Sequence, residues 1–377
     1  MKTKSLAPVH WGRTIVALSC ALACGSPSAE RGVGTGAGAS PSVPDRRHYI
    51  CYRVSGQLAV DGQLDEPAWQ AAAWSELFAD IEGYDRPAPD WHTRFKLLWD
   101  DEFFYIGAEL EEPHVWATLT ERDAVIYREN DFEVFIDPDG DTHDYYEIEI
   151  NALGTVWDLF LAKPYRDGGK AESGWNIAGL RAAVSVSGTL NDPSDRDEGW
   201  SVELAIPWVA VVEHAPGGRA PRDGERWRLN FSRVEWQLHV VDGVYRKVVD
   251  AAGGRPLRER NWVWSPQGAV NMHRPEMWGV VQFSGLVVGV GRALYQPPAD
   301  EAVRWALRQL YYAQRSYYRK HERYAADLAE LGIDLVGRDG SPLRPQLSVT
   351  ADGFEATAAG DGHAVWHIRQ DGKTWRE

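Results

Sequence analysis

The segment Tyr127–Asp158, YRENDFEVFIDPDGDTHDYYEIEINALGTVWD, predicts a pair of strands on which we expect the rest of the fold to be organised. Apolar and polar residues alternate in Asp131–Ile136 and again in Tyr145–Asn151, and a cluster of Pro, Asp and Gly lies between the two runs. This pattern is typical of two antiparallel strands joined by a turn.

Each of the two predicted strands has an apolar side and a polar side. Successive side chains of a strand point to opposite faces of a sheet. The predicted core face therefore carries Phe132, Val134, Ile136, Tyr146, Ile148 and Ile150. The opposite face carries Glu133, Glu147, Glu149 and Asn151. Like charges that face each other across a ladder destabilise a sheet, so we expect an Arg, a cation or a polyhydroxylated ligand to compensate them.

The composition of the 377-residue chain excludes some partners and favours others. Its 55 acidic and 40 basic residues give a net charge of −15, which argues against a nucleic-acid partner. The chain also has 18 Trp and 15 Tyr. Aromatic rings suit stacking on sugar rings, although we expect most of the Trp side chains in the core.

The N-terminal residues predict export. Basic residues precede a short apolar run, Thr14–Ala23, which is typical of a secretory signal peptide over residues 1–23 and is too short to span a bilayer. Cys24 follows the small residues Ala21-Leu22-Ala23, as in a bacterial lipobox, so we predict lipidation of Cys24. The protein is then lipid-anchored at the bacterial cell envelope, in the periplasm or at the outer membrane, and otherwise periplasmic or secreted. Its membrane contact is through the anchor alone.

A flexible tether is predicted to follow the anchor. Residues 24–47 are rich in Gly, Ser, Pro and Ala. Beyond Cys20 and Cys24 the chain has only Cys51, so the mature chain cannot form an internal disulfide.

Many short strands are predicted between residues 48 and 290. The runs are Val54–Val60, Thr93–Trp99, Phe103–Leu110, Ala182–Ser187, Trp200–Ile206, Arg226–Trp236, Val240–Val249 folded about Asp242-Gly243, and Gly279–Phe283. Asp65 is the expected N-cap of a short helix that has Pro67 in its first turn. In Trp200–Ile206 the alternation directs Glu203 outward. The pattern predicts a mostly β fold, an antiparallel β-sandwich.

Residues 298–377 predict a small α+β appendage. Ala299–Leu331 contains neither Gly nor Pro and has apolar residues at helical spacing, which predicts a long amphipathic helix. Three short strand-like runs follow at Gln346–Val349, Phe354–Thr357 and Ala364–Arg369. The aromatic stripe of the helix fits packing on its own sheet, or else a partner surface.

Several motifs in succession resemble the carbohydrate-binding module family 9-like domain. They are LAVDGQLDEPAW (58–69), LLWDDEFFYIGAEL (97–110), the opening segment, GWSVELAIPW (199–208), WRLNFSRVEWQ (227–237), NWVWSPQG (261–268) and RPEMWGVVQFS (274–284). The resemblance covers about Cys51 to Ser284. It implies a jelly-roll-like sandwich over residues 48–290 that binds polysaccharide, glycoside hydrolases as partners, and structural calcium in some members.

The resemblance also implies a set of sugar-binding positions. Sugar-binding members clamp a terminal sugar between two Trp; this chain has Tyr127 and Arg128 at the first place and Met272 and His273 near the second. Glu149 stands near a position that is Arg in a sugar binder. The candidate carbohydrate-binding residues are Tyr127, Glu133, Glu149, Asn151, Trp157, Arg233, Trp236 and Asn271, whose rings would stack on a sugar and whose polar groups would bind its hydroxyls.

A metal site is a second candidate. Asp137, Asp139 and Asp141 offer oxygen ligands at alternate positions, as a calcium loop does, but Thr142 and Ile148 stand where an EF-hand has Gly and Glu. The segment therefore fits a structural Ca²⁺ site or a plain acidic turn. The sequence has no HExxH, GxSxG or P-loop motif.

We expect non-catalytic binding of polysaccharide or oligosaccharide at the cell envelope, in support of carbohydrate catabolism. Two alternatives stay open. Glu133 with Glu147 or Glu149 could form the paired carboxylates of a glycoside hydrolase. The C-terminal aromatic helix could instead make the protein a structural or adhesion module.

Overall fold

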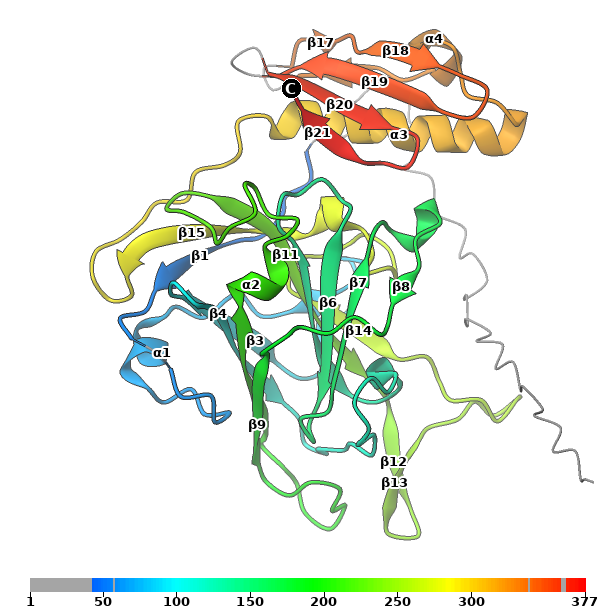
Figure 1. Ribbon diagram of the computed structural model, residues 1–377. Coiled ribbons are helices and arrows are strands. Elements are labelled where there is room, and N and C mark those ends of the chain that lie inside the picture. Colours follow the sequence, from blue (N-terminus) through cyan, green and yellow to red (C-terminus); the bar gives the residue numbers. More distant parts are fainter. Residues whose placement is uncertain (1–42, 57, 338–339, 361–363) are drawn as a thin grey trace, which may run out of the picture. The chain divides into compact units, whose positions relative to one another are not determined.

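A 13-stranded sheet dominates the computed structural model, which describes residues 43–56, 58–337, 340–360 and 364–377 (Figure 1). The strands are hydrogen-bonded in the order β8-β7-β6-β5-β11-β15-β1-β3-β4-β10-β9, and β14 and β2 extend from β11. Their bounds are β1 His48–Arg53, β2 Ala79–Asp80, β3 Thr93–Trp99, β4 Phe103–Glu111, β5 Asp131–Asp137, β6 Tyr145–Asn151, β7 Val156–Leu161, β8 Ala171–Glu172, β9 Arg181–Ser187, β10 Gly199–Pro207, β11 Arg226–Glu235, β14 Arg260–Val263 and β15 Gly279–Val287.

Two halves of this sheet enclose the main core. Phe95 of β3 and Phe231 of β11 are far apart in the strand order, yet their ring centroids are 3.9 Å apart. The six residues predicted for the core face of β5 and β6 all belong to this cluster. The mostly β fold and its sandwich character are therefore confirmed. The pairing is antiparallel except at β1, which runs parallel to β15 and to β3.

Short elements connect the strands and form the edges of the sheet. They are α1 Pro67–Ala71, α2 Trp208–Val211, η1 Ile126–Arg128, η2 Tyr165–Asp167, η3 Pro275–Met277 and the hairpin β12 Leu238–Val241 and β13 Val244–Lys247. The hairpin was predicted about Asp242-Gly243. Both residues have positive φ, 51° and 76°, which is the backbone that a two-residue hairpin turn requires.

The C-terminal residues form a helix with small sheets and a hydrophobic cluster of their own. The elements are α3 Glu301–His321, α4 Leu328–Leu331, β16 Leu335–Val336, β17 Pro342–Leu343, β18 Gln346–Val349, β19 Phe354–Ala359, β20 Val365–Arg369 and β21 Thr374–Arg376. Leu307, Leu310 and Tyr311 of α3 are buried against this sheet. Much of the aromatic stripe thus packs on its own sheet, as the first of the two interpretations held.

Several details of the sequence prediction are wrong. The first strand is β1 and not Val54–Val60, because Gly56, at φ 109°, interrupts the extended chain. Glu66 and not Asp65 precedes helix α1, without a side-chain cap. Glu203 lies on the side of β10 away from the main core, as the alternation directs it, but it is not exposed: its exposed fraction is 0%, and its carboxylate accepts hydrogen bonds from Trp69 Nε1 and from the backbone of Asp61.

The N-terminal predictions lie largely outside the described residues. These are the signal peptide, the lipidation of Cys24 and most of the tether. At the end of the predicted tether, Arg46 pairs with Glu301 at 2.6 Å and Arg47 donates to the Leu77 carbonyl at 2.6 Å. Within the described part of the chain, no helix is long and apolar enough to cross a membrane. The domain limits at 48–290 and 298–377 stay predictions.

Candidate carbohydrate-binding face

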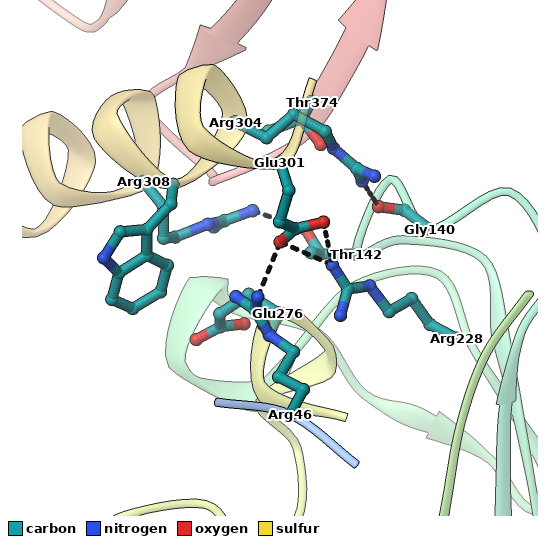
Figure 2. A pocket seen from close by; sticks show the side chains of 10 residues that line it. Arg46, Gly140, Thr142, Arg228, Glu276, Glu301, Arg304, Arg308 and Thr374 are labelled. Atoms are coloured by element: carbon teal, nitrogen blue, oxygen red, sulfur yellow. Dashed lines mark hydrogen bonds and ion pairs between the residues drawn. The ribbon is translucent and has the colours of Figure 1, made fainter. Parts of the chain in front are cut away.

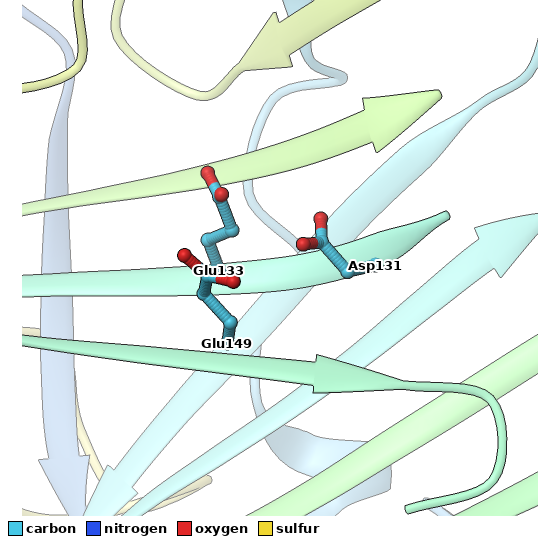
Figure 3. A group of neighbouring side chains, drawn as sticks. All are labelled: Asp131, Glu133 and Glu149. Carbon is cyan, nitrogen blue, oxygen red and sulfur yellow. The ribbon is translucent and has the colours of Figure 1, made fainter. Parts of the chain in front are cut away.

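The polar sides of β5 and β6 form one face of the sheet together with Trp157 and Leu159 of β7 and Ser232 of the neighbouring β11. Glu133 of β5 lies directly between Glu149 of β6 and Ser232 of β11 in the ladder. Glu147 pairs with Phe135, and Asp131 pairs with Asn151. Directly opposed residues share a face, so Asp131, Glu133, Glu147 and Glu149 project to the same side (Figure 3 shows three of them).

This polar face is buried, which the alternation did not predict. Loop residues and aromatic side chains fold over it and form a second hydrophobic cluster, which includes Ile126, Phe135, Tyr145, Leu159 and Trp278. The four carboxylic acids are between 0% and 5% exposed. They therefore lie in a medium that screens charge much less than water does.

Burial changes the protonation of all four acids in the same direction. It raises the pKa of Glu133 to about 7. Burial, together with the charge of Glu133, raises the pKa of Asp131, of Glu147 and of Glu149 well above the usual carboxyl range. No Lys or Arg of the described residues forms an ion pair with any of the four, so the described part of the chain does not supply the paired positive charge that buried carboxylates normally have.

Two exposed tyrosines border the carboxylates. Tyr127 is 41% exposed and Tyr165 is 40% exposed. The backbone N–H of Tyr127 donates to Glu149 Oε2 at 2.8 Å. Burial raises the pKa of Tyr165, and the charges of Glu147 and Glu149 raise it further. The Tyr165 phenol therefore lies close to these two carboxylates. Tyr165 was not a predicted site residue, because it follows Pro164 in a loop that has no motif or periodicity.

Trp157 and Trp236 lie next to Tyr127. Trp157 is in strand β7 and not in a turn as expected; it is 9% exposed, and its ring centroid is 6.2 Å from that of Tyr127. The Trp236 Nε1–H donates to the Tyr127 carbonyl at 3.0 Å. Lys247 Nζ lies 3.3 Å from the Trp236 ring centroid, so a cation already covers one face of this ring.

Other predicted residues make contacts within the protein. The Arg233 guanidinium pairs with Glu112 and Glu235, each at 2.8 Å, and donates to the Glu111 carbonyl at 2.7 Å. Asn151 Oδ1 accepts the backbone N–H groups of the turn that follows β6, and its Nδ2 donates to the Leu119 carbonyl. The structure therefore brings Tyr127, Glu133, Glu149, Trp157 and Trp236 into one region. The polar groups of Arg233 and Asn151 are instead engaged in the hydrogen bonds and ion pairs described above.

Asn271 lies in a turn beside the aromatic cluster. Its Oδ1 accepts the backbone N–H of His273 at 2.9 Å. The ring of His273 in turn contacts Tyr165, with 4.4 Å between centroids, and its Nδ1 lies 3.0 Å from the Tyr145 hydroxyl. Asn271 thus shapes the loop at the position where the resemblance implies a second clamp residue.

The predicted metal loop is a group of three aspartates with oxygen atoms within 4.8 Å of one another, a spacing that can hold a metal ion. Asp137 is fully buried and accepts the N–H groups of Gly140 and Thr142. Burial and the neighbouring Asp141 raise the pKa of Asp139 to about 6. Lys373 of the C-terminal sheet lies 2.8 Å from Asp141 and supplies one positive charge to the loop.

A small pocket beside this loop is lined mainly by charged residues (Figure 2). The carboxylate of Glu301, at the start of α3, accepts bonds from Arg46 at 2.6 Å and from Arg228 at 2.8 Å. These ion pairs join α3 to the end of the predicted tether and to β11. The pocket is a charged contact region, and the aromatic ring that lines it, Trp305, already has the Arg46 guanidinium 5.3 Å from its centroid.

Comparison with known proteins identifies the domain. The family model described as "carbohydrate family 9 binding domain-like" matches residues 60–286, more than half of the chain. The chain belongs to this family. The match covers the strands from β2 to β15, and the family 9-like domain is typically non-catalytic. The resemblance drawn from the sequence motifs is therefore confirmed.

Two relatives each match less than half of the chain. An exoglucanase XynX of Acetivibrio thermocellus is 26% identical over 164 residues, which cover 43% of this chain and 13% of the relative. An endo-1,4-β-xylanase A of Thermoanaerobacterium saccharolyticum is 26% identical over 163 residues, 43% of this chain and 12% of the relative. The chain thus spans a small part of the length of either enzyme.

The fold also resembles a solved structure. A family 9 carbohydrate-binding module of Caldicellulosiruptor kristjanssonii, determined in complex with cellotriose, is 16% identical with a TM-score of 0.40. The alignment covers 66% of this chain and all of that module.

Proposed function

We propose that this protein binds carbohydrate, without cleaving it, at the face formed by the polar sides of β5 and β6 and the adjoining Trp157 of β7. The observation that carries the proposal is the pair of exposed rings, Tyr127 and Tyr165, beside the buried carboxylates of Glu147 and Glu149. The family membership of residues 60–286 supports the same function.

The chemistry of this face suits a sugar. The apolar side of a pyranose packs on aromatic rings, and its hydroxyls donate to carboxylate oxygens. A hydrogen bond to a charged acceptor is stronger in a poorly solvated site than in water. The two tyrosines then take the place of the Trp clamp that the sequence lacks at Tyr127 and Met272.

Non-catalytic binding fits the carboxylates better than hydrolysis. A glycosidase uses two acids whose environments separate their pKa values, one protonated and one ionised. Here burial and mutual repulsion raise the pKa of Glu133, of Glu147 and of Glu149 together. Among the described residues, no Lys or Arg forms an ion pair that would favour the ionised form of one of these acids over the others.

Binding affinity for soluble oligosaccharides tests the proposal. We would titrate the full chain with cello- and xylo-oligosaccharides, chosen because the two relatives are an exoglucanase and a xylanase by name. Loss of one stacking ring is worth about 0.5–1.5 kcal/mol, so Tyr127→Ala and Tyr165→Ala should each weaken binding roughly 2- to 12-fold. Tyr318→Ala is the matched control, because Tyr318 is also 41% exposed but lies on α3.

Two outcomes would contradict the proposal. One is the absence of binding to any of these sugars or to the corresponding polysaccharides. The other is an equal loss of affinity in Tyr318→Ala. Release of reducing ends that disappears in Glu133→Gln, with binding retained, would favour the hydrolase instead.

We further propose that a lipid anchor at Cys24 holds this domain at the bacterial cell envelope, where it supports partner hydrolases in carbohydrate catabolism. The signal-like residues 1–23 and the following Cys support the anchor. Metabolic labelling with a fatty-acid analogue tests it: the label should appear in the wild-type protein and be absent from Cys24→Ala.

A further inference from the structure

The four carboxylic acids of the polar face form no ion pair with a Lys or Arg in the part of the chain that the structure describes. Asp131 is 0% exposed, Glu149 2%, and Glu133 and Glu147 5%. Arg233 of the neighbouring strand β11, whose charge lowers the pKa of Asp131, is held by Glu112 and Glu235. Burying an ionised carboxylate without a partner is costly, so each acid needs either a proton or a cation.

The spacing of the carboxylate oxygens suits a single ion. One oxygen each from Asp131, Glu133 and Glu149 lies within 4.8 Å of the others (Figure 3). Two oxygens bound to one Ca²⁺ at about 2.3–2.6 Å can be at most about 5.2 Å apart. The three acids come from β5 and β6, whose ladder fixes their positions.

Two buried oxygen atoms at this site have no hydrogen-bond partner among the described residues. One is Asp131 Oδ2; the other oxygen of this carboxylate accepts the Val234 N–H at 3.0 Å. The second is the hydroxyl of Ser232, which is 0% exposed and stands directly opposite Glu133 in the ladder. Buried polar atoms are rarely left without partners, so these two point to a missing ligand.

We propose that Asp131, Glu133 and Glu149 bind one divalent cation that prefers oxygen ligands, Ca²⁺, with the Ser232 hydroxyl as a further ligand. The ion neutralises two of the charges on the face and gives Asp131 Oδ2 and Ser232 Oγ their partner. This inference is independent of the proposed function, because protein oxygens alone hold the ion. It is also separate from the loop at Asp137–Asp141.

The site connects to the carbohydrate face through Glu149, which also accepts the Tyr127 N–H. Tyr127 is one of the two proposed stacking rings. The ion should therefore fix the backbone of η1 on which this ring is carried, and calcium should strengthen glycan binding if glycan binding occurs.

Titration of the chelator-treated full chain with CaCl₂ tests the site. Calorimetry should show that the wild type binds the ion. In Glu133→Gln and in Glu149→Gln the affinity for the ion should be at least 10-fold weaker. Ser232→Ala should weaken binding severalfold. Asp139→Asn is the control: it changes the other acidic group and should leave this ion in place.

A second measurement shows that the variants are folded. Glu149→Gln removes one of the repelling charges, so without calcium it should melt at or above the temperature of the wild type. Calcium should raise the melting temperature of the wild type and of Asp139→Asn but not that of Glu149→Gln. The proposal is overturned if the wild type binds no calcium at millimolar concentration, or if Asp139→Asn loses the ion while Glu149→Gln keeps it.

Discussion

Arg233 gives a direct test of whether a predicted ligand residue supports the fold instead. Its guanidinium is 1% exposed and forms ion pairs with Glu112 and Glu235, which are 2% and 6% exposed. In Arg233→Met both carboxylates stay buried and lose the guanidinium that pairs with each of them at 2.8 Å. Breaking a buried pair in this way costs about 3–5 kcal/mol, because the remaining charge is left uncompensated. We expect a loss of that size in the free energy of unfolding.

Urea unfolding followed by Trp fluorescence measures this loss. Arg94→Met is the matched control, since Arg94 also pairs with a glutamate across a ladder, at 2.8 Å from Glu109, but both side chains are more than 40% exposed. An exposed pair contributes about 0.2–1 kcal/mol. The reasoning is refuted if Arg233→Met loses no more than this control. A weaker glycan affinity with unchanged stability would instead restore Arg233 as a sugar-binding residue.

Three further predictions concern single contacts. Gly62→Ala should lower the free energy of unfolding by about 1–3 kcal/mol, because φ is 86° and a Cβ would lie 2.7 Å from the backbone of β9. Gly243→Ala, where φ is 76° and the space is open, should lower it by about 1 kcal/mol. Urea unfolding compares the two variants. Trp69→Phe should cost about 1–3 kcal/mol in the same assay, since it removes the indole donor 2.9 Å from Glu203 in a buried site. Burial lowers the pKa of His273 from 6.5 to about 3, so the unfolded chain binds more protons below pH 6.5 and the free energy of unfolding should fall from pH 6.5 toward 3. In His273→Gln the free energy of unfolding, measured at several pH values, should depend less steeply on pH in this range. An unchanged pH dependence would contradict this assignment.

The sequence predicted most of the strands because local alternation determines them. Thr93–Trp99 and Tyr145–Asn151 begin and end as expected, and the predicted pairing of Glu133 with the acidic side of the next strand is present. These features depend on the period of a strand and on turn residues. Both can be read from a window of a few residues.

What the sequence could not predict depends on contacts between distant segments. The acidic face is buried because η1, β14 and η3 fold over it, and alternation shows only that a residue lies opposite the core, not what covers it. Glu203 is buried for a similar reason, since the loop after Leu58 brings Asp61 and Gly62 onto its carboxylate. Tyr165 joins the candidate site through the fold of a loop that carries no pattern.

The burial of the acidic face also makes its negative charge costly for stability. On a solvated face, four carboxylates would be screened by water and salt and would need no explanation. On this buried face they repel one another, and the basic side chains around them are already engaged: Arg233 with Glu112, and Lys247 over the Trp236 ring. Apolar residues of similar size would fill these positions at a lower cost in stability. With the described basic residues engaged, protons or a bound cation are left to compensate the charge, and the Asp131 oxygen that has no partner among the described residues is available to such a cation.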